Sequence, residues 1–111
     1  MTTTPEPPYL AVIFTNRRAN WGDEAVDRDY EAAAARMVEL AATIPGHLGV
    51  DSVRAADGTG ITVSYWADEA AIERWRRHPD HLDAQSRGRD EWYEWYEVRV
   101  AHVVRAHGSP T

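Results

Sequence analysis

Apolar and polar positions alternate from Ile61 to Trp66, and this period of two predicts a β-strand with two different faces. Asp68 follows as a helix N-cap candidate, because its carboxylate can accept hydrogen bonds from free backbone N–H groups. Ala71, Ile72 and Trp75 then fall on one face of a helix, since residues three and four apart are neighbours. This junction fixes where a helix meets a sheet, and it predicts that Trp66 lies at the rim of whatever the sheet encloses.

The same two patterns, alternation for strands and a spacing of three to four residues for helices, predict the remaining elements. Strands are expected at residues 9–15, 47–54, 61–66 and 91–105, a long amphipathic helix at 24–43, and shorter helices at 68–77 and 80–88. Pro45 and Gly46 end the long helix, and Asp57-Gly58 is a hairpin signal between two of the strands. The first strand is apolar on both faces, so we expect it to be central and covered on both sides.

Strand, helix, strand, strand, helix, strand is the order of a ferredoxin-like α+β fold, in which two helices cover one face of a four-stranded antiparallel sheet. The other face carries apolar side chains, which a single copy leaves exposed to water. We therefore expect a homodimer in which two sheets stack into a barrel-like interior. Residues 1–8 are expected to be a flexible lead-in and residues 107–111 a tail, with one domain at 9–106.

Composition excludes several classes of function. The 111-residue chain has a net charge of −6, which disfavours a nucleic-acid partner, and it has no cysteine for disulfides or thiolate metal sites. No apolar run reaches the roughly 20 residues that span a bilayer, and the N-terminal residues do not read as a secretory signal. We therefore expect a cytoplasmic protein that does not associate with membranes.

Three segments, YLAVIFTNR, IPGHLGVDS and GITVSYWADEAAIERWRRHPDHLDAQSRGRDEWY, together resemble the antibiotic biosynthesis monooxygenase (ABM) superfamily of dimeric α+β barrels. The resemblance covers about residues 9–106. It implies a βαββαβ protomer, a homodimer, and a pocket between the sheet and the helices of each protomer. The superfamily includes cofactor-independent monooxygenases (oxidoreductases) that oxidise polycyclic phenols with O2, so the resemblance implies this activity. In that chemistry the carbanion of the substrate supplies the electron.

The superfamily also includes haem-degrading enzymes that use an Asn, a Trp and a His. Asn16 and Trp75 match the first two of these residues, but Gln85 stands where those enzymes carry the haem-ligating His. His78 and His81 are out of register by several residues. Haem binding or cleavage is therefore the third alternative, and no cofactor is expected.

Three residues are candidates for catalysis: Asn16, Trp66 and His81. An Asn both donates and accepts hydrogen bonds, which suits the orientation of a phenol or of O2. A His titrates near neutrality and can act as a general base. His78 and His81 without a third ligand make a poor metal site, so no metal is expected.

Seven further residues are expected to line a substrate pocket for a small aromatic molecule: Phe14, Ser64, Trp75, His78, Gln85, Trp92 and Tyr96. The alternative for the Trp and Tyr residues is packing in the core or at a dimer contact, because these are the largest apolar side chains in the chain. Function therefore stays open between an enzyme and a non-catalytic homodimer that binds a small apolar ligand.

Overall fold

The computed structural model describes residues 3–109 of the chain. Residues 1–2 and 110–111, which belong to the predicted lead-in and tail, lie outside the described residues. The elements in chain order are β1 (Tyr9–Arg18), α1 (Glu24–Ala42), β2 (His47–Arg54), β3 (Thr59–Trp66), α2 (Glu69–Arg77), α3 (Pro79–Arg87), a π-helical turn η1 (Gly88–Trp92) and β4 (Tyr93–Val103). Within this range, no helix is both long enough and apolar enough to cross a membrane.

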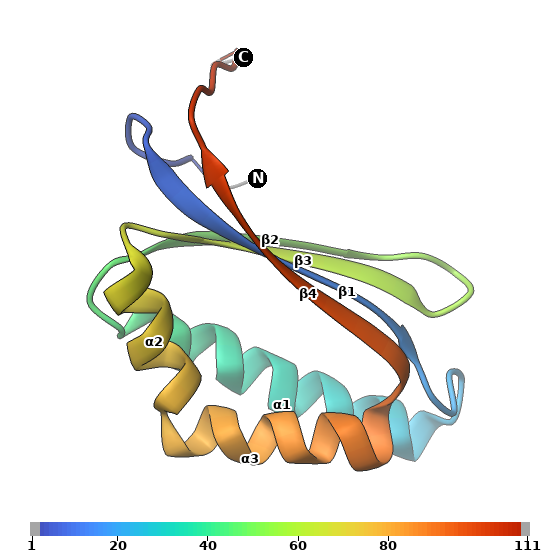
Figure 1. Ribbon diagram of the computed structural model, residues 1–111. Coiled ribbons are helices and arrows are strands. Elements are labelled where there is room, and N and C mark those ends of the chain that lie inside the picture. Colours follow the sequence, from blue (N-terminus) through green and yellow to red (C-terminus); the bar gives the residue numbers. More distant parts are fainter. Residues whose placement is uncertain (1–2, 110–111) are drawn as a thin grey trace.

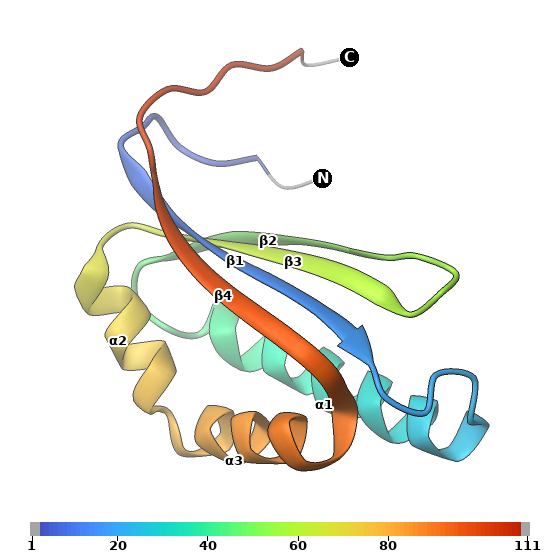
Figure 2. The same cartoon turned by 45° about the vertical axis from the view of Figure 1, so that its right-hand side comes forward.

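The strands of residues 3–109 form one four-stranded antiparallel sheet in the order β2-β3-β1-β4. All three α-helices lie against the same side of this sheet, and the other side is uncovered (Figures 1 and 2). This arrangement confirms the predicted ferredoxin-like α+β fold.

Alternation along β1 decides which side chains meet the helices. Leu10 packs with Ala41 of α1, Ala71 of α2 and Trp66 in the buried core, and Val12 packs against that group. Because successive side chains in a strand point to opposite faces, the other even-numbered residues of β1 also point toward the helices. Residues paired across strands share a face, so the register places the helix-side residues of β2, β3 and β4 as well.

The predicted junction between β3 and α2 is confirmed. The Asp68 carboxylate accepts a hydrogen bond from the backbone N–H of Ala71 at 2.8 Å and caps α2. Ala71 is fully buried, and the loop after α1 lies directly against it: a Cβ placed on Gly46 would be 2.5 Å from the Ala71 Cβ. The absence of a side chain at Gly46 therefore lets α2 pack close to the end of α1.

Several strand boundaries, and one expectation about burial, differ from the sequence prediction. The first strand runs on to Arg18, because Asn16 and Arg18 continue its alternation with buried polar side chains. The last strand begins at Tyr93 and not at residue 91, since the π-helical turn prolongs the preceding helix. The first strand is central, as expected, but helices cover only one of its faces, so the expectation of cover on both sides is wrong for a single copy (Figure 1).

Candidate functional site

His81 is stacked on Trp75, with ring centroids 4.1 Å apart and an angle of 14° between the planes. Its Nδ1 lies 3.0 Å from the backbone oxygen of Trp75. A carbonyl oxygen only accepts hydrogen bonds, so Nδ1 must be the donor, and in the neutral ring Nε2 carries the lone pair. Burial lowers the pKa of His81 below its usual value, with a smaller lowering from His78, although the hydrogen bond to Trp75 acts the other way. His81 is therefore a neutral imidazole at pH 7, with Nε2 as its basic atom.

His78 lies beside this stack but has a structural task. Its Nδ1 accepts a hydrogen bond from the backbone N–H of Asp80 at 3.2 Å and so caps α3. Pro79 occupies the first turn of that helix, where its missing N–H costs nothing. The His78 ring is tilted against Trp75, with centroids 6.2 Å apart.

Trp66, predicted to lie at a rim, is fully buried in the core. It stacks on Trp75 with centroids 6.3 Å apart, and its indole N–H donates to the hydroxyl of Ser64 at 2.9 Å. The edge of the His47 ring meets Trp66 at 5.0 Å between centroids. In this structure Trp66 thus packs against Trp75, and Ser64 holds Trp66 in place.

Asn16 is fully buried in a row of residues that crosses the sheet on its helix side. The row runs from Arg54 on β2 through Gly60 on β3 to Asn16 on β1 and Tyr96 on β4. Arg54 donates to the Asn16 side-chain oxygen at 2.9 Å, to the Gly58 carbonyl at 2.7 Å, and to the Tyr30 hydroxyl at 3.0 Å. The Asn16 amide nitrogen has no hydrogen-bond partner among the described residues.

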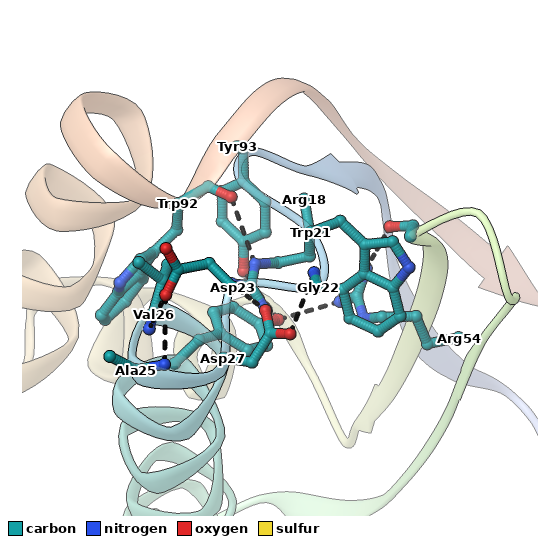
Figure 3. A network of polar contacts seen from close by, with 12 residues as sticks. Arg18, Trp21, Gly22, Asp23, Ala25, Val26, Asp27, Arg54, Trp92 and Tyr93 are labelled. Carbon is teal, nitrogen blue, oxygen red and sulfur yellow. Dashed lines mark hydrogen bonds and ion pairs between the residues drawn. The ribbon is translucent and has the colours of Figure 1, made fainter.

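A second arginine of the site, which is fully buried, lies at the end of β1 (Figure 3). Arg18 is 1% exposed and donates to the Asp27 carboxylate at 3.1 Å and to the Trp92 carbonyl at 3.3 Å. Its guanidinium also lies over the Tyr30 ring at 3.9 Å from the centroid. Asp27 is held in turn by the backbone N–H of Gly22. Arg18 therefore joins β1, α1 and the π-helical turn before β4.

Eight of the ten predicted site residues fall into two groups at opposite ends of the sheet. Trp66, Trp75, His78 and His81 form one group, which is linked to Ser64; Asn16 belongs to the other, with Phe14 and Tyr96 adjoining it. Leu10 pairs with Trp66, and Asn16 lies six residues further along β1, which separates the two groups by about 20 Å on the strand. Gln85 is half-buried on α3.

An apolar strip on β4 connects these two ends. Val98 and Val100 pair with Phe14 and Val12, so they point toward the helix side. They are nevertheless 52% and 51% exposed, because the helices leave β4 uncovered there. Tyr96, next along the same face, is 42% exposed, and its ring contacts that of Phe14. Val98, Val100 and Tyr96, which we call the β4 strip, are accessible to an apolar ligand.

Two measurable hollows lie elsewhere, on the helices. One of about 110 Å³ lies between α1 and α3, and the other, of about 450 Å³, lies between the start of α1 and the turn η1. Trp92 lines both hollows, and no other predicted site residue lines either. No group of three His, Cys, Asp or Glu side chains within residues 3–109 is placed to hold a metal ion.

Comparison with known proteins identifies the family of this chain. The family model "Antibiotic biosynthesis monooxygenase" matches residues 15–87. The chain belongs to the antibiotic biosynthesis monooxygenase family. A similar protein, the uncharacterized protein YqjZ of Bacillus subtilis, is 53% identical over 105 residues, which cover 95% of this chain and 88% of YqjZ.

Two relatives with named activities are more distant. The jasmonate monooxygenase ABM of Pyricularia oryzae is 42% identical over 44 residues, which cover 40% of this chain and 20% of that protein. The crystal structure of SnoaB, a cofactor-independent oxygenase from Streptomyces nogalater, is similar with a TM-score of 0.65, at 22% identity and over 91% of this chain and 98% of SnoaB. The likeness to SnoaB shows the ABM fold alone.

Four residues that shape the Asn16 end of this ABM chain are not among the site residues predicted from the sequence: Arg18, Tyr30, Arg54 and Tyr93. One signal was present. Arg18 follows Asn16 by two residues in a strand, so the two share a face. Tyr30 and Arg54 come from other elements, and no local pattern indicates that they meet.

Proposed function

We propose that this chain is a cofactor-independent monooxygenase that oxidises an electron-rich aromatic compound, of the polycyclic phenol class, with O2. Its family supports this proposal, as do the activities named for the Pyricularia oryzae and Streptomyces nogalater proteins. The state of His81 carries it: the ring is neutral, its tautomer is fixed by the Trp75 carbonyl, and its basic Nε2 is left for a substrate.

A neutral imidazole with a lowered pKa can take a proton from a phenol or from the CH2 group of its keto tautomer. The resulting carbanion is the electron donor, so no metal or flavin is needed for the first step. Trp75 and the β4 strip offer the flat and apolar surfaces on which an aromatic substrate would lie.

The proposed reaction balances in atoms and electrons. His81 removes one proton from the substrate CH2 group, and the carbanion passes one electron to O2. The substrate radical and superoxide combine into a C–O bond and take up a proton, which gives a hydroperoxide. Loss of the remaining C–H proton breaks the O–O bond, so that the carbon becomes a carbonyl and one oxygen atom leaves as water. The substrate is thus oxidised from CH2 to C=O, and His81 returns to its neutral form.

Oxygen consumption with a panel of anthrones and quinols tests this function. The wild-type chain is expected to consume O2 with at least one compound, with a rate that rises with pH through a pKa below 6.5 and then levels off. His81→Asn keeps an N–H donor for the Trp75 carbonyl but has no base, so the rate should fall about 100-fold or more.

His107→Asn is the matched control, because it makes the same substitution at an exposed His beyond the end of β4 that belongs to neither group of site residues. It should retain the wild-type rate. If no compound of the panel supports O2 uptake, the monooxygenase function is wrong. If His81→Asn is as fast as wild type, His81 is not the base.

The exposed β4 strip also favours a second candidate, a homodimer that binds a small apolar ligand without catalysis. Quenching of tryptophan fluorescence by the same compounds, without any O2 uptake, would support that function over the enzyme.

A further inference from the structure

The row Arg54–Gly60–Asn16–Tyr96 holds more hydrogen-bond donors and more positive charge than the described residues satisfy. Arg54 is half-buried, and all three of its hydrogen-bond partners are neutral oxygens. None of the ion pairs found within residues 3–109 includes Arg54. A half-buried guanidinium without an anion is costly, because it has lost water without gaining a counter-charge.

Asn16 adds an unmet donor beside this charge. The guanidinium of Arg54 is a hydrogen-bond donor only, so the side-chain oxygen of Asn16 must face it. This fixes the orientation of the Asn16 amide. The amide nitrogen is then left fully buried without an acceptor. A buried donor with no partner is rare in native proteins and calls for an explanation.

The neighbouring groups do not neutralise the row. Arg18 and Arg54 bring two positive charges, and Asp27, which pairs with Arg18, brings one negative charge. Tyr93 donates to Tyr30 at 3.0 Å, and burial raises the pKa of Tyr93 well above its usual value, so it stays a neutral phenol. One positive charge is therefore left without a counter-charge.

Gly60 shows that the geometry depends on a missing side chain. A Cβ placed on Gly60 would lie 2.6 Å from Nη1 of Arg54. Any other residue at this position would push the guanidinium out of the row, so Gly60 lets Arg54 cross β3 and reach Asn16 on β1. Tyr96, on the edge strand and 42% exposed, stands between Asn16 and solvent.

We propose that Arg54 and the Asn16 amide bind an anionic oxygen group of the substrate, a carboxylate, at the end of the β4 strip opposite His81. This inference rests on the proposed function and narrows its substrates to aromatic acids whose carboxylate lies far enough from the reacting carbon to span the two groups, about 20 Å apart along β1. The carboxylate supplies the acceptor that Asn16 lacks and the charge that Arg54 lacks, and it enters past the Tyr96 ring. Arg54 and Asn16 are then specificity residues, remote from the proton transfer at His81.

Binding of 2-naphthoate, with 2-naphthamide as its neutral counterpart of the same shape, tests this proposal by calorimetry. Wild-type protein is expected to bind the acid about 10- to 100-fold more tightly than the amide, the preference typical of a charge-assisted hydrogen bond. Arg54→Met should remove this preference, and Asn16→Asp, which replaces the donor by a negative charge, should reverse it. Arg36→Met, which removes an exposed guanidinium paired with Asp80, is the matched control and should keep it.

Thermal unfolding of each variant shows whether it folds, and Arg54→Lys, which keeps the charge, should keep part of the preference if Arg54→Met is unstable. Equal binding of acid and amide by wild type, as expected if water alone fills the row, overturns the proposal, and so does a lack of any naphthoate binding. An Arg54-dependent preference without O2 uptake by any compound supports the anion site and contradicts the enzyme. O2 uptake that is equally fast with neutral and acidic compounds contradicts only the anion site.

Discussion

Arg18 is the residue whose burial is hardest to reconcile with its chemistry. A guanidinium that is 1% exposed has given up its hydration, and a carboxylate, a carbonyl and an aromatic face replace it. Only the carboxylate of Asp27 also balances the charge. Arg18 therefore depends on Asp27 more than on its other partners.

Replacing Asp27 by Asn should lower the free energy of unfolding by about 2–3 kcal/mol, since a hydrogen bond to a charged group is lost and the Arg18 charge is left buried. Urea denaturation followed by tryptophan fluorescence measures the change. Asp29→Asn is the control: it removes an exposed ion pair with Arg87, which contributes less than about 1 kcal/mol. Equal losses in the two variants would mean that Arg18 does not need its counter-charge.

The candidate site could be predicted from the sequence only where neighbours in the chain are also neighbours in space. Trp75, His78 and His81 lie on two consecutive helices, and the structure does bring them together. The structure buries Trp66, which the strand-end position had placed at a rim, because α2 folds back over it. Arg54 reaches Asn16 across a strand, through space that Gly60 leaves, and no local pattern carries that information.

At the scale of elements, most of the architecture follows from periodicity and caps. Alternation predicts the strands, and Asp68 and Asp57-Gly58 mark a helix start and a hairpin that the structure contains. The end of the first strand differs where polar residues are buried, and the start of the last strand differs where a helix changes its type. The pattern places Asn16 and Arg18 after the end of the first strand because they are polar, and it places Glu91 and Trp92 at the start of the last strand, whereas they belong to the π-helical turn. Tertiary contacts decide such positions, and a local pattern does not report them.

Gly46 and Gly22 make a matched pair for testing how closely α2 must approach α1. Their φ angles are +95° and +96°, so an Ala at either position costs about 1–2 kcal/mol of backbone strain. A Cβ at Gly22 meets nothing within 4 Å, whereas a Cβ at Gly46 would lie 2.5 Å from the Ala71 Cβ. Gly46→Ala should therefore cost a further 1–3 kcal/mol or so, from overpacking against α2. Chemical denaturation of both variants gives the difference, and equal losses would show that the α2 contact yields without cost.

The whole molecule is one sheet with helices on one side only (Figure 2). The uncovered face carries the odd-numbered residues of β1 and their partners, with Ile13 and Val63 paired at its centre. Ile61, Val53 and Trp95 on the same face are 43%, 63% and 46% exposed. An ion pair between Glu97 and Arg99 lies on the face toward its β4 edge. An apolar centre with charged groups at the edge is typical of a surface that packs on another protein surface.

We expect a second copy of this chain to cover that face. In a dimer with two-fold symmetry the same face of each copy forms the interface, so the two apolar centres would pack on each other. Val63→Asp places a charge at the centre, where stacking would bury it without a partner, so this variant should be monomeric. Val38→Asp is the control, since Val38 lies on α1, away from this face, and is 48% exposed. Light scattering coupled to gel filtration, at micromolar concentration, should give twice the chain mass for the wild type and for Val38→Asp. The chain mass alone is expected for Val63→Asp, which must still show the far-ultraviolet circular dichroism of a folded protein. A wild-type protein that is folded and monomeric at this concentration would show that the uncovered face does not pair with itself.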